Sequence, residues 1–276
     1  MNRLLYIVNE VFFMIFFAKK RNISLIIVVF ICSLLIYSLN IGRNNAIEVS
    51  GSIQKIILID PGHGGEDPGA VSEFTQVKEK DVNLKIGLDL KKKLEDSGYK
   101  VMMTRESDKL NYSTDIRNIV KKRTDDLLNR KKMMDECGAD LVVGIHLNKY
   151  GGTTKQRIHG AQVFYPPNDP SSQKLAEILQ SSIKSNADPL NERVALEKKI
   201  NGKPIIIFNN PKTTIAVVEC GFLSDQEEGQ LLIGEAYQGK LVYSIKQGID
   251  IFFNPNAANS RQPIDVTLSP ANSAKP

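Results

Sequence analysis

Apolar and polar positions alternate between two kinds of segment from Lys55 onward. Short runs rich in valine and isoleucine, nearly continuous in apolar character, are typical of strands buried on both faces. They cover Lys55–Asp60, Tyr99–Thr104, Asp140–His146, Ala161–Tyr165 and Ile215–Glu219. Longer segments between them have the pattern of helices: Asp81–Asp96, Thr124–Glu136, Ser171–Ser185, Asp225–Ile233 and Tyr237–Phe253. This alternation predicts an α/β domain with a mostly parallel central sheet flanked by helices.

The N-terminal region has a different pattern, a run of 19 residues without charge from Ile23 to Ile41. At ~1.5 Å per helical residue, such a run approaches the ~30 Å hydrocarbon thickness of a bilayer. The basic triplet Lys19-Lys20-Arg21 precedes it, so the positive-inside rule keeps residues 1–22 cytoplasmic or interfacial and places everything after residue 41 outside. Because Tyr37-Ser38-Leu39 is too bulky for a small-x-small cleavage site, we expect 23–41 to be an uncleaved transmembrane signal anchor.

The rest of the chain divides into three parts. Residues 42–54 are polar and predict a short linker. Residues 55–253 carry the alternating pattern and predict the folded domain. Residues 254–276 are rich in proline, serine, asparagine and alanine, which indicates a disordered tail.

Charge and cysteine usage exclude two classes of protein. The net charge is +5, but residues 1–50 contribute +3 of it, which leaves only +2 for the other 226 residues. Binding to a nucleic-acid backbone needs a concentrated basic surface, so no nucleic-acid partner is expected. Three cysteines cannot form a disulfide framework, and Cys137 and Cys220 are predicted to be buried free thiols.

The candidate catalytic and metal-binding residues lie where the predicted strands end. His63 follows the first strand in the glycine-rich turn DPGHGG, and His146 ends the third strand in LVVGIHLN. Glu79 lies where the next loop enters the first long helix, and Glu219 ends the fifth strand in VVECGF. Ligands of open α/β sheets bind outside the carboxyl ends of the strands, so these side chains can converge. Two histidines and one carboxylate form a catalytic zinc arrangement, and a second glutamate can act as general base.

Each of these residues also has a simpler interpretation. A histidine at a strand end is commonly a hydrogen-bonded core or loop residue, and Glu79 could be a solvated helix start. A phosphate-binding loop is disfavoured because Glu66 and Asp67 follow the glycines, where that fold needs Lys and Ser or Thr. Glu219 is harder to dismiss, since a carboxylate that ends a buried strand needs a partner. His159, in a polar loop, is predicted to be a surface residue.

The sequence resembles a known enzyme family in four blocks. They are ILIDPGHGGEDPGA, EKDVNLKIGLDLKKKLEDSGYKVMMTR, NRKKMMDECGADLVVGIHLN and AVVECGFLSD. In this order and spacing they resemble the signature blocks of the zinc-dependent N-acetylmuramoyl-L-alanine amidases, over residues 55–253. A catalytic domain alone on one N-terminal anchor is similar to the spore-cortex, germination-specific subgroup.

The resemblance implies a single α/β domain with His63, Glu79 and His146 as ligands of Zn²⁺ and Glu219 as the catalytic glutamate. It implies hydrolysis of the amide between N-acetylmuramic acid and L-alanine in peptidoglycan, which removes stem peptides from glycan strands. In the spore-cortex subgroup, this reaction serves cortex maturation and muramic-lactam formation.

Further residues beside these blocks are candidates for supporting roles. Asp60, Asp67 and Asn148 could orient the ligands, although Asp60 could equally cap the turn before Pro61. Arg105 could meet a peptide carboxylate, whereas Arg130, within a helix, is predicted to form a surface ion pair.

Two rival functions remain open at this level. The chain could be a non-catalytic membrane-anchored scaffold that binds the cell wall, although none of the four site positions is lost. It could instead be another zinc hydrolase of peptidoglycan, a carboxypeptidase or a sugar deacetylase. The expected partners are peptidoglycan, the membrane through the anchor and, as a further candidate, a protein activator, with the catalytic domain on the extracytoplasmic side.

Overall fold

The computed structural model describes residues 54–152 and 157–255. The predicted anchor over 23–41, the linker up to residue 53 and all but the first two residues of the predicted tail lie outside the described residues. Of the helices described, none combines the length and the apolar character that a membrane crossing requires.

All five predicted strands and all five predicted helices are present in the described residues. The strands are β1 (Ile56–Pro61), β2 (Lys100–Met103), β3 (Leu141–Asn148), β4 (Gln162–Tyr165) and β8 (Ile215–Phe222). The helices are α2 (Glu79–Glu95), α3 (Ile119–Glu136), α4 (Pro170–Asn186), α5 (Gln226–Ile233) and α6 (Glu235–Phe253). The sequence pattern missed the short strands β5 (Leu196–Glu197), β6 (Lys199–Ile200) and β7 (Lys203–Pro204) and the 3₁₀ helix η1 (Ile206–Phe208).

The main sheet has six strands in the order β2-β1-β3-β8-β4-β5. Strands β2, β1, β3 and β8 are mutually parallel, whereas β4 runs antiparallel to β8 and β5 runs parallel to β4. The predicted mostly parallel sheet is therefore confirmed, with one reversal near an edge. The parallel connections carry helices α2 and α3, as crossovers between parallel strands require.

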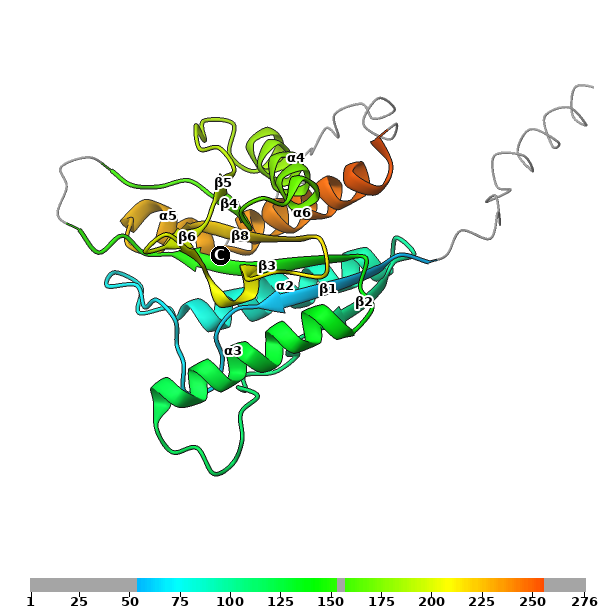
Figure 1. Ribbon diagram of the computed structural model, residues 1–276. Helices are drawn as coiled ribbons and strands as arrows, with labels where there is room; N and C mark the ends of the chain where they lie inside the picture. Colours follow the sequence, from blue (N-terminus) through cyan, green and yellow to red (C-terminus); the bar gives the residue numbers. More distant parts are fainter. Residues whose placement is uncertain (1–53, 153–156, 256–276) are drawn as a thin grey trace, which may run out of the picture. The chain divides into compact units, whose positions relative to one another are not determined.

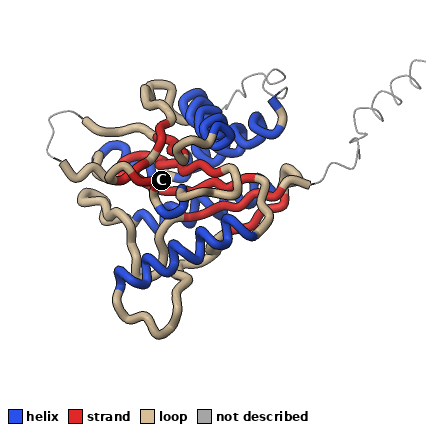
Figure 2. The backbone as a smooth tube through the Cα atoms, in the orientation of Figure 1, coloured by secondary structure: helices blue, strands red, loops and turns tan. Residues whose placement is uncertain are grey.

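Helices cover both faces of this sheet, which Figures 1 and 2 show as strands between helical layers. Side chains alternate along β1, so that Ile57 and Ile59 join the larger core cluster with α2, α4 and α6, while Leu58 joins the smaller cluster with α3 and η1. All three side chains are fully buried. Burial on both faces explains why the strands are continuous apolar runs, since each such side chain contributes about 1.5–3 kcal/mol.

The parallel strands bring distant parts of the sequence to one edge of the sheet. Pro61 at the end of β1 pairs with Ile145 in β3, and His146 is the register partner of Glu219 in β8. The loop after β1 and the first turn of α2 reach the same edge. Polar side chains that are far apart in the sequence thus form one cluster, because the strand register aligns the ends of the strands that carry them.

Candidate metal centre and general base

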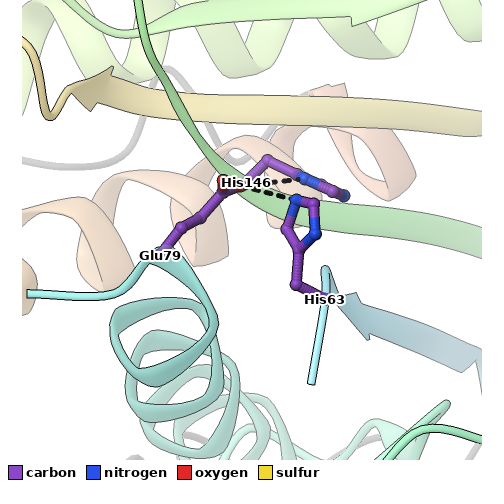
Figure 3. A group of neighbouring side chains, drawn as sticks. All are labelled: His63, Glu79 and His146. Carbon is purple, nitrogen blue, oxygen red and sulfur yellow. Dashed lines mark hydrogen bonds and ion pairs between the residues drawn. The ribbon is translucent and has the colours of Figure 1, made fainter. Parts of the chain in front are cut away.

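His63, Glu79 and His146 converge at this edge from three different elements (Figure 3). His63 comes from the loop after β1, Glu79 from the first turn of α2 and His146 from β3. One ligand atom from each residue lies within 4.8 Å of the other two. Glu79 Oε1 is 3.2 Å from His63 Nε2 and 3.2 Å from His146 Nδ1. In the part of the chain that the structure describes, this is the one such group of histidine, cysteine and acidic side chains.

Glu79 is buried, so a solvated helix start does not describe it. Its Oε1 also accepts a hydrogen bond from the Leu147 N–H at 3.0 Å, and its Oε2 accepts one from the Ala70 N–H at 2.8 Å. Burial by itself raises the pKa of Glu79, but hydrogen bonds from His146 and His63 hold that pKa well below its usual range. The carboxylate is therefore ionised and fixed in one orientation.

His63 is held by its second ring nitrogen, because Nδ1 lies 2.7 Å from Asp67 Oδ2. Asp67 is held in turn by Arg123, whose NH2 group is 2.8 Å from Oδ1. A carboxylate on one nitrogen of a histidine fixes the ring and leaves the other nitrogen for a metal. The predicted orienting role is thus supported for Asp67. In the metal-free protein burial lowers the pKa of His63, but hydrogen bonds with Asp67 and Glu79 raise it to about 9.

The loop that carries His63 has an unusual backbone. His63 itself has a φ of +61°, a conformation that costs a non-glycine residue about 1–3 kcal/mol. The loop closes on itself through the Gly64 and Asp67 backbones, at 3.0 and 2.8 Å. Gly62 is required for a different reason, because a Cβ there would lie 2.1 Å from His146 Cε1. Gly62 therefore leaves the space that the His146 ring occupies.

Two buried arginines hold this loop in place through hydrogen bonds to its backbone carbonyls. Arg130 donates to Asp60 Oδ1 at 2.7 Å, to Asp126 Oδ2 at 2.6 Å and to the His63 carbonyl at 2.8 Å. Arg105 donates to the Pro61 and Gly62 carbonyls at 2.8 and 2.9 Å. The prediction of a surface ion pair for Arg130 is wrong, because its side chain is only 5% exposed.

The structure also shows the contacts of the other residues that the sequence suggested as supporting or alternative residues. Within the described residues, Asp60 has no hydrogen bond to a candidate ligand; its Oδ1 accepts hydrogen bonds from Arg130 and Thr104. Asn148 contributes its backbone carbonyl, which accepts from the Leu223 N–H at 2.9 Å. His159 is not part of the metal cluster and is half-buried rather than a surface residue. Cys137 and Cys220 are free thiols as predicted; Cys220 is fully buried, whereas Cys137 is partly exposed.

Glu219 lies one strand away from the metal cluster and is 6% exposed. Its Oε1 forms an ion pair of 2.7 Å with Lys198 Nζ. The partner that a buried carboxylate needs is thus Lys198, which no sequence motif marks. It follows β5, in the stretch of very short strands that the hydrophobic pattern does not reveal.

A cavity of about 320 Å³ is lined both by the two candidate histidine ligands and by Glu219. Its polar lining includes His63, His146, Asp67, Arg123 and Glu219, and its apolar lining is formed by Leu127, Ile200, Ile205, Ile206, Ile207 and Val217. Cavities of roughly 300–1,000 Å³ with few polar groups among apolar walls are typical of small-molecule sites. The arrangement can hold a metal ion beside a carboxylate base and accept a substrate that is partly apolar.

The chain is similar to several known proteins. The sequence matches the N-acetylmuramoyl-L-alanine amidase family over residues 57–250. It is 35% identical over 199 residues to the germination-specific N-acetylmuramoyl-L-alanine amidase of Bacillus subtilis (strain 168), covering 72% of this chain and 80% of that protein. It is 26% identical over 243 residues to the N-acetylmuramoyl-L-alanine amidase AmiA of Escherichia coli (strain K12), covering 73% and 77% of the two chains.

Solved structures show the same fold. The CwlD amidase from Clostridioides difficile, in complex with the GerS lipoprotein, is similar with a TM-score of 0.68 and 34% sequence identity. That comparison covers 73% of this chain and 100% of the CwlD chain. An N-acetylmuramoyl-L-alanine amidase from Clostridium difficile 630 gives a TM-score of 0.61 with 28% identity, covering 76% of this chain and 100% of that chain.

Proposed function

The chain belongs to the N-acetylmuramoyl-L-alanine amidase family, and from this premise we propose that it is a zinc enzyme in which His63, Glu79 and His146 hold the metal and Glu219 is the general base. The reaction is hydrolysis of the amide between N-acetylmuramic acid and L-alanine in peptidoglycan. The observation that supports the site assignment is the convergence of three ligand atoms within 4.8 Å beside a buried glutamate on the adjacent strand.

The residues fit zinc in both type and spacing. A tetrahedral ion with bonds of about 2.0–2.2 Å separates its ligand atoms by roughly 3.3–3.6 Å. The distances from Glu79 Oε1 to the two histidine nitrogens, 3.2 Å each, are close to that range. Two imidazoles and one carboxylate leave a fourth position open, as catalytic zinc sites do. Asp67 supplies the outer carboxylate on His63 that such sites use to orient a histidine.

Zinc held by His63, Glu79 and His146 would supply Lewis-acid chemistry to the amide carbonyl and to the attacking water. Glu219 then accepts the proton of that water and delivers it to the departing L-alanine nitrogen. Glu79, with both oxygens engaged in hydrogen bonds, is the less suitable base. The isoleucine-rich lining of the cavity offers an apolar surface to the lactyl and alanyl methyl groups.

We further propose that this amidase acts on spore cortex during maturation or germination. The support is its similarity to the germination-specific amidase of Bacillus subtilis, over 80% of that protein's length, and to CwlD. Because the CwlD structure is a complex with a lipoprotein, a protein partner is also proposed for this chain.

The location is a proposal from the sequence. Residues 23–41 anchor the chain in the membrane, residues 42–54 link the anchor to the enzyme, and the catalytic domain faces the cell wall. A reporter enzyme that is active only outside the cytoplasm should be active when it is fused after Pro276. Signal from a reporter that is active only in the cytoplasm would contradict this topology.

The site assignment is tested by two glutamine variants of the full-length protein. Glu219→Gln should keep about one zinc per chain but lose about 10²–10⁴-fold in hydrolysis rate, because glutamine keeps the shape and cannot accept the proton. Glu79→Gln should lose zinc itself, since an amide oxygen is a poorer ligand than a carboxylate. Glu73→Gln, at an exposed position, is the matched control. Loss of zinc from Glu219→Gln with retention in Glu79→Gln would mean that the two roles are exchanged.

The products of digestion distinguish the rival functions. An amidase releases peptides that begin with L-alanine and leaves the glycan intact. A carboxypeptidase would release C-terminal amino acids, a deacetylase would release acetate, and a scaffold would release nothing. Mass spectrometry of purified peptidoglycan after digestion by the zinc-loaded protein therefore decides among them.

A further inference from the structure

Lys198 is the one cationic side chain bonded to Glu219 in the part of the chain that the structure describes. Its Nζ lies 2.7 Å from Glu219 Oε1, and the two side chains are 30% and 8% exposed. The other two cations that line the cavity have different carboxylate partners: Arg123 pairs with Asp67, and Arg130 pairs with Asp60 and Asp126.

The position of Lys198 is set by contacts on both sides of its chain. Its backbone N–H donates to the Tyr165 carbonyl at 3.1 Å, and the preceding strand β5 pairs with β4. Its ammonium also lies 4.6 Å from the centre of the Phe164 ring, within the range of a cation–π interaction. The ammonium thus contacts Phe164 of β4 as well as Glu219.

The ion pair engages only one oxygen of the glutamate. Within the described residues, Oε2 of Glu219 has no hydrogen bond, whereas Oε1 is bonded to Lys198. A buried carboxylate without a charged partner is strongly disfavoured in its ionised form. Lys198 therefore meets both needs of a general base in this place: it compensates the charge, and it fixes the rotamer while leaving one oxygen for the proton.

We propose that Lys198 is a positioning residue of the amidase reaction, which holds the Glu219 carboxylate in one orientation through its Oε1 and leaves Oε2 for the proton. This inference rests on the proposed role of Glu219. It gives a catalytic role to a residue of the segment from β5 to β7, whose Ile200 also lines the cavity. It also predicts that Lys198 acts on turnover through Glu219 and has no part in holding the metal.

The test compares three variants of the full-length zinc-loaded enzyme. Lys198→Met removes the charge and keeps the length, and Lys198→Arg keeps the charge. Lys199→Met is the matched control, because Lys199 follows directly in the chain and pairs with the exposed Glu197. Each variant is measured for zinc content, thermal unfolding, and kcat and KM on a soluble muropeptide.

The expected result is a fall in kcat for Lys198→Met of about 10²-fold, the size of effect that a misplaced reacting group produces. KM and zinc content should stay near the wild-type values, and Lys198→Arg should restore most of the lost kcat. Lys199→Met should behave as wild type. An unchanged kcat in Lys198→Met, or an equal loss in Lys199→Met, would overturn the proposal. Should Lys198→Met fail to fold, Lys198→Gln supplies the same comparison.

A double-mutant cycle separates this proposal from a purely structural role. If Lys198 acts through Glu219, Lys198→Met should have little further effect in the Glu219→Gln background. Fully additive losses would show that Lys198 acts elsewhere. Wild-type activity of the Glu219→Gln variant would refute the role of Glu219 itself. Normal activity of Lys198→Met together with an inactive Glu219→Gln would refute only the role of Lys198.

Discussion

Replacing Arg130 by methionine should damage both stability and metal binding. The methionine keeps the apolar volume in place but removes the charge shared by Asp60 and Asp126, which are 1% and 5% exposed. Breaking a buried ion pair by removing one partner costs about 3–5 kcal/mol. This is a lower bound here, because the same substitution removes the 2.8 Å hydrogen bond from Arg130 to the His63 carbonyl and one of the two donors to the Pro61 carbonyl, at 2.7 Å.

The measurement is the free energy of unfolding of the full-length protein by denaturant and heat. For a domain of this size, a loss of about 3–5 kcal/mol lowers Tm by roughly 6–20 °C. Zinc affinity, measured on the fraction that remains folded, should also fall, because the His63 loop loses its support. Arg117→Met is the control, since Arg117 is exposed. It should shift unfolding by less than about 0.5 kcal/mol.

A second substitution checks the electrostatic reasoning. Adding Asp126→Asn to Arg130→Met removes one of the two uncompensated buried charges, while the asparagine oxygen can still accept from the Asn111 N–H. The double variant should therefore be more stable than Arg130→Met alone. A loss below about 1 kcal/mol in Arg130→Met, or no recovery in the double variant, would refute the argument that this buried network supports the site.

Two more predictions concern the metal. Gly62→Ala should reduce zinc occupancy by displacing the His146 ring, whereas Gly239→Ala, with open space around its Cβ, should not; equal occupancy in both would contradict the contact argument. His63, with a pKa of about 9 in the metal-free protein, is protonated at pH 7 and must lose that proton to bind zinc. Zinc affinity should therefore fall as the pH decreases below about 9. Calorimetric titrations with zinc at pH 7, in buffers of different ionisation enthalpy, should show the release of a proton, and this release should disappear by pH 10. A binding heat at pH 7 that does not depend on the ionisation enthalpy of the buffer would contradict this prediction.

The regular elements and the candidate ligands were predictable from the sequence because their signals are local. Strands such as β1 and β3 are buried on both faces, so their apolar runs are visible without knowledge of their neighbours. His63 and His146 follow those runs, and the carboxyl ends of parallel strands meet at one edge. The same reasoning placed Glu219 beside them, and the register of β3 with β8 confirms that placement.

What only the tertiary structure decided is how the charges of this edge are paired. Lys198 and Glu219 are 21 residues apart, and Arg130 is 70 residues from Asp60. The two-residue strands β5 to β7 are too short to show a periodic pattern, so nothing in the sequence placed Lys198 at the cavity. Arg130 looks like an ordinary polar position of a helix, yet it is buried because α3 lies over the loop that carries His63. Ion-pair partners depend on the approach of whole elements, and that approach is set by packing of the two cores rather than by any local pattern.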